Sequence, residues 1–356
     1  MNHLRGIVAL LIVVLPNAPL QAHNLLLKPD VDRVNRSLHG RVIDHTDNHG
    51  AQRAIYSTAL GTRRDLYVYI PPGFDPCLRY PLVLWLHGFA QDEESFLQGV
   101  VQALDRAIYE GKLPPVIVAA PDGSLRGISG YFSPGSFYLN TPRAGAFEDY
   151  LLVDVWNFLF RNYPIRPERE AHVAAGASMG AGAAFHHAIK YQDRFAIVAG
   201  FFPPVNLRWE DCRGHYKGNF DPCCWGWRED FTHSHEVIGR FYGIVPVRSG
   251  RMINPLYGRR NPQTATLISQ DNPIEMLDTY DVREGQLEMY IAYGGRDQFN
   301  IDAQVESFLY RARERGLTIG VGYDPRGKHD MATALRLLPG LLDWLGPRLM
   351  PYGPTP

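Results

Sequence analysis

The chain of 356 residues has little charge imbalance, few cysteines and no internal repeat. Lysine and arginine total 36 against 37 aspartates and glutamates, and no basic run or stripe stands out, so nucleic acid is not an expected partner. The four cysteines include no C-x-x-C pair, which argues against zinc and thioredoxin-like chemistry. What remains is a globular chain whose 45% hydrophobic residues can form a large core.

The first 22 residues predict a secretory signal peptide. A basic Arg5 precedes an apolar stretch at residues 7–15, and a small Ala22 closes the segment. The apolar stretch is too short to span a bilayer comfortably, and nothing like a second span follows. We expect residues 1–22 to be removed and residues 23–356 to form one secreted or periplasmic domain. A retained membrane anchor or a plain buried segment is the alternative.

Export would make the cysteines candidates for disulfides. Cys77 lies in a turn by itself, whereas Cys212, Cys223 and Cys224 crowd into one segment. Four cysteines allow three pairings, and a bond from Cys212 to Cys223 or Cys224 is the economical one.

Apolar runs typical of buried parallel strands alternate with helical patterns along the chain. We expect strands at 81–87, 116–120, 172–175, 195–201, 287–293 and 318–323, and helices at 93–109, 148–163 and 301–315, with a last helix ending near Trp344. Residues 54–60 and 64–70 are predicted to pair as antiparallel strands, after a solvated loop at 23–51. This alternation predicts an α/β fold with a mainly parallel, doubly wound sheet.

Residues 203–285 interrupt the alternation. The segment is rich in aromatic residues, prolines and charges, and it holds three of the four cysteines. We expect a cap or lid over the active edge of the sheet, with Trp225 as a candidate substrate-binding residue. Tyr131 and Phe137, in the long loop after residues 116–120, are further candidates for an acyl or aromatic pocket, although they could simply pack the loop.

Two histidine-rich stretches contain ligand types for a metal ion. At residues 44–49 no helix or strand is predicted to fix a ligand geometry, and a solvated loop is favoured. At residues 233–236 we favour surface histidines near a helix start. No metal and no cofactor is therefore expected.

The stretch from His172 to His186 organises the chain. Residues 176–180 read Gly-Ala-Ser-Met-Gly between a predicted strand and a helix that starts near Met179. This order fits a G-x-S-x-G nucleophile elbow, which would present the hydroxyl of Ser178 above the sheet. The alternative is a glycine-rich turn with an idle serine.

A serine nucleophile needs a base, and the base needs an acid to orient it. Asp297 and His329 each follow a predicted strand, so their loops would open on the same edge as Ser178. Asp302 or Asp324 could replace Asp297, which could instead cap a helix. For the oxyanion hole, we expect the backbone N–H groups of Phe89, after the strand at 81–87, and of Met179. His87 is interpreted as shaping its loop.

Several motifs together resemble the putative-esterase family of α/β-hydrolases. They are IPPGFDP, LHGF, SFYLN with FEDYLL, GASMGAG, YGGRDQFN and GKHD, between Ile55 and Trp344. The family includes feruloyl and acetylxylan esterases, S-formylglutathione hydrolases, enterochelin esterases and mycolyltransferases. The resemblance implies Ser178 as nucleophile, Asp297 as acid, His329 as base, and Phe89 with Met179 as oxyanion donors. Ala181, where many members have a second glycine, and the cysteine-bearing insertion depart from the pattern.

The function expected from these features is that of an exported serine carboxylesterase. It would hydrolyse small-molecule or polysaccharide esters, acetyl or feruloyl, through an acyl-enzyme. An acyltransferase or a serine peptidase could use the same triad. A catalytically idle α/β-hydrolase that binds glycans or a partner protein is the alternative from another class.

Overall fold

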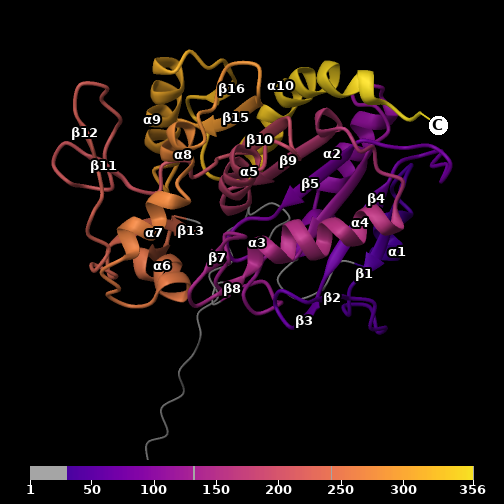
Figure 1. Cartoon of the computed structure of the whole chain (residues 1–356), viewed down its shortest axis with the longest axis horizontal. Helices are drawn as coiled ribbons and strands as arrows, with labels where there is room; N and C mark the ends of the chain where they lie inside the picture. The colour runs from indigo at the N-terminus through magenta and orange to yellow at the C-terminus, as the bar shows by residue number, and fades with distance from the viewer. Residues whose placement is uncertain (1–29, 131–132, 242, 356) are drawn as a thin grey trace, which may run out of the picture.

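The computed structural model of the chain describes residues 30–130, 133–241 and 243–355 (Figure 1). The predicted signal peptide at residues 1–22 lies outside them, as does Tyr131. Within the described ranges, no helix combines the length and the apolar character that crossing a membrane requires.

An eight-stranded sheet runs through the centre of the molecule in the order β1-β4-β6-β5-β9-β10-β15-β16. Its strands are β1 (Arg41–His45), β4 (Leu66–Ile70), β5 (Leu82–Leu86), β6 (Ile117–Pro121), β9 (His172–Ala177), β10 (Ile197–Phe201), β15 (Glu288–Gly294) and β16 (Ile319–Asp324). Neighbours from β6 to β16 are parallel, whereas β4 is antiparallel to both β1 and β6. The predicted mainly parallel sheet is confirmed.

Helices cover the sheet and bury its apolar strands (Figure 1). They include α2 (Val100–Tyr109), α4 (Trp156–Asn162), α5 (Met179–Lys190), α9 (Ile301–Glu314) and α10 (Met331–Leu349). Helix α5 packs across β5, β9 and β10, and α10 packs across β15 and β16. The small residues along α5 allow this close approach, because a Cβ on Gly200 of β10 would lie 2.8 Å from the Cβ of Ala181.

The N-terminal part of the described chain differs from the prediction. The expected loop at 23–51 contains α1 (Val31–Asn35) and the edge strand β1. Residues 54–60 pair with 64–70 only at Ile55 and Arg64. Instead β2 (Ile55–Ser57) pairs with β3 (Thr62–Arg64) in a short hairpin, and β4 joins the main sheet. Four of the five residues of β4 are buried, which is typical of a strand in the interior of a sheet, and such a strand has a hydrogen-bonded neighbour along each edge.

Two predicted helices contain irregular turns. The pattern at 93–109 divides into a 3₁₀ turn η2 (Glu93–Leu97) and α2, separated by Gly99 with φ 114°. The pattern at 148–163 runs through α3 (Phe147–Asp149), a π-helical stretch η3 (Tyr150–Val155) and α4. Both predicted segments are therefore helical over most of their length, but each has an irregular first part.

The segment at 203–285 is built from short elements. They are β11 (Trp209–Asp211), β12 (Trp225–Trp227), β13 (Val237–Phe241), β14 (Val245–Arg248), α6 (Ser249–Tyr257), α7 (Thr264–Gln270) and α8 (Pro273–Thr279). The hairpin β11–β12 projects at the left of Figure 1, while α6 and α7 lie beside the hairpin of β7 (Asn140–Thr141) and β8 (Gly145–Ala146). Helix α8 packs against α5 and α9.

A disulfide between Cys212 and Cys224 links the two strands of the β11–β12 hairpin. Cys77 and Cys223 are free and exposed. Of the two pairings left open by the sequence, the structure has the one to Cys224.

Candidate active site

Ser178 lies at the turn between β9 and α5, in a backbone conformation that side chains rarely adopt, with φ 53°. Its N–H donates to the carbonyl oxygen of Phe201 at 2.8 Å. A Cβ on Gly180 would lie 2.1 Å from the carbonyl oxygen of Leu86, and one on Gly176 would lie 2.6 Å from the same atom. The glycines therefore let the turn close against the sheet, which holds the serine at its tip.

Ser178, His329 and Asp297 form one chain of hydrogen bonds. The distance from Nε2 of His329 to Oγ of Ser178 is 2.9 Å, and from Nδ1 of His329 to Oδ2 of Asp297 it is 2.7 Å. The other carboxylate oxygen of Asp297 accepts the N–H of Phe299 at 2.7 Å. Because the carboxylate faces Nδ1, a neutral His329 carries its proton there and turns the lone pair of Nε2 toward the serine.

The two alternative acids lie elsewhere. Asp324 makes an ion pair with Arg336 at 2.7 Å. Asp302 is in the first turn of α9, where burial and the nearby charge of Asp297 raise the pKa of its carboxyl. No hydrogen bond joins either of them to His329 within the described ranges.

Groups that the sequence reading did not single out hold His329 in place. The rings of Phe202 and Phe299 lie 4.9 and 5.0 Å from the imidazole, measured between ring centroids. Gln298 accepts the backbone N–H of His329 at 3.1 Å and donates to its carbonyl oxygen at 3.4 Å. A usable signal was their place directly after β10 and β15, at the edge where the triad forms.

Phe89 and Met179 lie on the two segments that the oxyanion prediction named. Phe89 follows β5, and Met179 is the first residue of α5. A Cβ on Gly135 would lie 2.1 Å from Sδ of Met179 and 3.5 Å from Cδ2 of Phe89, so both side chains converge on this glycine. Neither backbone N–H has a hydrogen-bond partner within the described chain. Both remain available to an acceptor.

A buried network supports the loop after β5. His87 accepts the N–H of Gly123 on Nε2 at 2.8 Å, and its Nδ1 donates to the carbonyl oxygen of Gly88 at 2.9 Å. Tyr138 accepts the N–H of His87 at 3.2 Å and donates to the carbonyl oxygen of Pro121 at 3.1 Å. His87 is thus occupied in shaping the loop, and Tyr138, from the SFYLN motif, supports the same loop from a fully buried position.

The three aromatic candidates for substrate binding have different surroundings. Phe137 lies 6.5 Å from Phe89 between ring centroids, next to the oxyanion loop. Trp225 packs in an aromatic cluster with Trp209 and Trp227 in the β11–β12 hairpin, and none of its described ring contacts is with a triad residue. Tyr131 lies outside the described residues.

One described cluster could in principle hold a metal ion. Ligand atoms of Glu148, His186 and His187 lie within 4.8 Å of one another, whereas residues 44–49 and 233–236 form no such group of three in the described chain. The Glu148 carboxylate already contacts His186 at 2.9 Å, Lys190 at 2.7 Å and Tyr191 at 2.6 Å. Although burial opposes ionisation, these donors hold the pKa of Glu148 well below its usual range. The Lys190 ammonium group thus neutralises the Glu148 carboxylate at the position that a metal ion would take.

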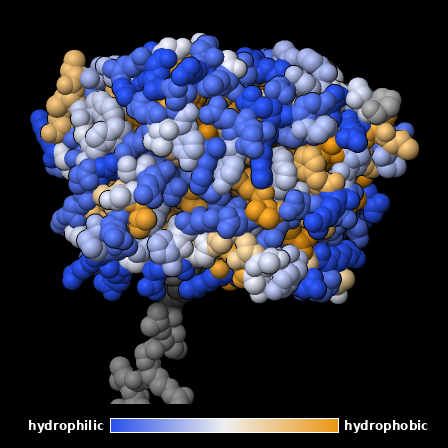
Figure 2. All heavy atoms as spheres, viewed as in Figure 1, coloured by the Kyte–Doolittle hydropathy of each residue, from blue (hydrophilic) through white to orange (hydrophobic). Residues whose placement is uncertain are grey.

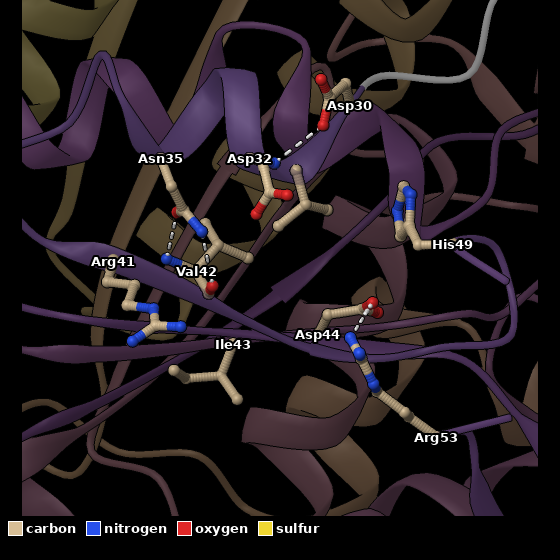
Figure 3. Close-up of a pocket in the computed structure, with 10 residues that line it drawn as sticks. Asp30, Asp32, Asn35, Arg41, Val42, Ile43, Asp44, His49 and Arg53 are labelled. Atoms are coloured by element: carbon tan, nitrogen blue, oxygen red, sulfur yellow. Dashed lines mark hydrogen bonds and ion pairs between the residues drawn. The ribbon is translucent and has the colours of Figure 1, made fainter. Parts of the chain in front are cut away.

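A cavity of about 460 Å³ lies between α1 and β1 (Figure 3). Its lining includes the ion pair of Asp44 with Arg53 at 3.0 Å, and Asn35 bonds both backbone groups of Val42. Strand β1 is at the edge of the sheet, four strands from β9. At about 4.8 Å per strand this cavity is roughly 19 Å from the triad's sheet position, so it is not part of that site.

Comparisons with known proteins agree with this arrangement. Residues 57–331 match a family described as "Putative esterase". The chain is 25% identical over 178 residues to an S-formylglutathione hydrolase of Arabidopsis thaliana, covering 46% of this chain and 61% of that protein. It is 28% identical over 250 residues to an esterase of Mycobacterium tuberculosis, covering 67% of this chain and 46% of that protein. The chain thus spans about half to three fifths of the length of these curated relatives.

Solved structures share the fold. A ferulic acid esterase superimposes with a TM-score of 0.63 at 16% identity, over 87% of this chain and 99% of that one. An S-formylglutathione hydrolase from Agrobacterium tumefaciens gives a TM-score of 0.59 at 16% identity, over 88% of this chain and 96% of that one. With the match over residues 57–331, these likenesses establish that the chain belongs to the putative-esterase family and has the α/β-hydrolase fold.

Proposed function

We propose that this protein is a serine carboxylesterase. The observation that carries the proposal is the hydrogen-bond chain from Ser178 through His329 to Asp297. In the acylation step, Oγ of Ser178 attacks the ester carbonyl carbon while Nε2 of His329 takes the hydroxyl proton. The imidazolium that forms is stabilised by Asp297 and then gives the proton to the departing alkoxide. An acyl-enzyme and a free alcohol result.

Deacylation repeats the same steps with water. His329 takes a proton from a water molecule, the hydroxide attacks the acyl carbon, and the proton returns to Oγ of Ser178 as the acid leaves. We assign the N–H groups of Phe89 and Met179 to the oxyanion formed in both steps, because both are free of partners within the described chain.

We further propose that the enzyme is exported and acts on acetyl or feruloyl esters of polysaccharides, with residues 203–285 as the cap that selects among them. The disulfide of Cys212 with Cys224 suits an oxidising compartment. Phe137, beside the oxyanion loop, is placed to contact an acyl group. The similar solved structure named as a ferulic acid esterase motivates feruloyl esters as one of the first substrates to test.

The test is hydrolysis of p-nitrophenyl acetate by the protein and by Ser178→Ala, with a fluorophosphonate as a covalent label. We expect kcat to fall at least about 10³-fold in Ser178→Ala, and the label to be found on Ser178 by peptide mass mapping. Ser37→Ala, which changes an exposed serine in the turn after the distant α1, is the control and should keep full activity. An inactive, unlabelled wild-type protein would favour a glycan- or partner-binding role instead.

A further inference from the structure

A second cavity, of about 680 Å³, lies in the segment at 203–285 and belongs to none of the catalytic elements. Two stretches of chain line it. One is residues 232–236, which lead into β13, and the other contributes Asn254, Arg259 and Arg260 at the end of α6. Its volume is in the range of sites that bind small molecules or one part of a larger ligand.

The cavity carries an excess of positive charge. The guanidinium groups of Arg259 and Arg260 form no hydrogen bond or ion pair with any described residue. The acidic side chains nearby are already paired, since Glu236 contacts Arg228 at 2.5 Å and Asp230 contacts His233 at 3.0 Å. Arg259 and Arg260 are exposed to solvent and have no partner among the described residues, so both can pair with an anion that enters the cavity.

The backbone around these arginines is unusual. Arg260 has φ 52°, in the left-handed region of backbone conformation. Glycine or asparagine is more common in this conformation than arginine. A Cβ on Gly258 would lie 3.4 Å from Cδ of Arg143, which brings a third arginine next to the pair. The side chain of Arg143 also has no partner in the described chain.

The elements that border the cavity also contact the neighbours of the triad. A Cβ on Gly239 in β13 would lie 2.1 Å from the ring of Phe299, which stands beside His329. Glu236 is three residues before Gly239, or about 10 Å along an extended chain. On the other border, Leu256 and Tyr257 of α6 pack with Phe137. A substrate of several rings could reach the cavity, whereas a simple acetate could not.

We propose that this cavity binds a carboxylate carried by the substrate, at a distance from the ester bond that is cleaved. The proposal rests on the proposed esterase function and adds to it that acidic esters are preferred. The forked, planar guanidinium of arginine matches a carboxylate with two parallel hydrogen bonds, and neither Arg259 nor Arg260 has an ion-pair partner among the described residues. The carboxylate could be on the alcohol part, as in a uronic acid of a polysaccharide, or on the acyl part.

Two matched pairs of substrates distinguish these sources. The first pair is acetylated xylan oligosaccharides that bear glucuronate, and the same oligosaccharides after reduction of the carboxyl group to an alcohol. The second is the p-nitrophenyl monoester of sebacic acid and p-nitrophenyl decanoate, whose longer acyl chains can span the distance between the triad and the cavity. We expect kcat/KM about tenfold higher for the acidic member of one pair, mainly through KM, and a smaller preference at high salt.

The variant Arg259→Gln/Arg260→Gln should reduce this preference to within about twofold and leave p-nitrophenyl acetate hydrolysis unchanged. Arg213→Gln removes an exposed arginine of the same segment outside the cavity and should keep the preference. Equal kcat/KM within both pairs for the wild type, or a preference that survives in the double variant, overturns the proposal. If the wild type hydrolyses no ester, the esterase function fails, and calorimetric binding of the two oligosaccharides still decides whether the cavity prefers a carboxylate.

Discussion

The catalytic core and the segment at 203–285 are built in opposite ways. Around Ser178, glycines bring backbone against backbone, and the side chains of β9 and α5 are almost all buried. The other segment is built from short helices and two-stranded hairpins with one disulfide, and Ile244 is 77% exposed. Figure 2 shows a face covered mostly by hydrophilic side chains, with scattered apolar groups. From this difference we infer that the core holds the proposed triad in place, whereas changes in residues 203–285 would alter which substrates enter the site.

The largest expected effect comes from replacing an aspartate by asparagine inside the proposed triad, compared with the same replacement outside it. Asp297→Asn should lower kcat for p-nitrophenyl acetate about 10⁴-fold, because an amide favours the wrong tautomer of His329. Asp324→Asn alters an acid that pairs with Arg336, and we expect kcat to stay within about twofold of the wild-type value. Melting temperatures of both variants serve to exclude unfolding as the cause. A similar loss of kcat in both variants would contradict the assignment of Asp297.

A second pair of variants compares glycines. In Gly180→Ala the new methyl group would meet the carbonyl of Leu86 at 2.1 Å, and we expect the free energy of unfolding to fall by about 2–3 kcal/mol. In Gly226→Ala, in the β11–β12 hairpin, the nearest atom is a side-chain oxygen of Glu210 at 3.2 Å, which can move. We expect a change within about 0.5 kcal/mol there. Urea unfolding measures the free energy of unfolding of both variants. Equal decreases would contradict the tighter backbone packing that we assign to the region around Ser178.

A third and smaller effect concerns pH. Burial, followed by the charges of Asp47 and Asp122, raises the pKa of Asp65 to about 7. The folded state therefore keeps this proton up to about pH 7, whereas an unfolded aspartate releases it near about pH 4. The contribution of Asp65 to stability thus falls as pH rises from about 4 to 7.

Asp65→Asn should remove this dependence, so that the variant gains roughly 2 kcal/mol relative to the wild type between pH 4.5 and pH 8. The difference between the two proteins in urea unfolding isolates Asp65 from the other titrating groups. Asp230→Asn, an exposed acid in the segment at 203–285, is the control and should show no such gain. A constant difference across this pH range for Asp65→Asn would contradict the raised pKa.

The parts of the structure predicted from sequence are those that local patterns determine. The buried strands, the start of α5 at Met179 and the order Ser178, Asp297, His329 all follow from apolar runs and from residues placed at strand ends. The pairing of β4 was predicted wrongly, because its partners are set by burial on both faces and β1 lies far from it in sequence.

Other features could not be read from the sequence because they depend on contacts between distant segments. Phe202 and Phe299 flank His329 from two different loops, and Tyr138 joins the ends of β5 and β6. The cavity at Arg259 and Arg260 depends on how α6 meets residues 232–236. The spacing of residues along the sequence does not predict contacts between such distant segments.

The contact of Gly180 with the carbonyl of Leu86 has a consequence for how such a protein changes over generations. We infer that the position of Oγ of Ser178, the proposed nucleophile, is set by main-chain contacts at this turn, which substitutions in residues 203–248 need not alter. Insertions, deletions or replacements in the hairpins of residues 203–248 can therefore arise in related sequences while Oγ of Ser178 keeps its position. Substrate preference can therefore evolve without a change in the proposed triad.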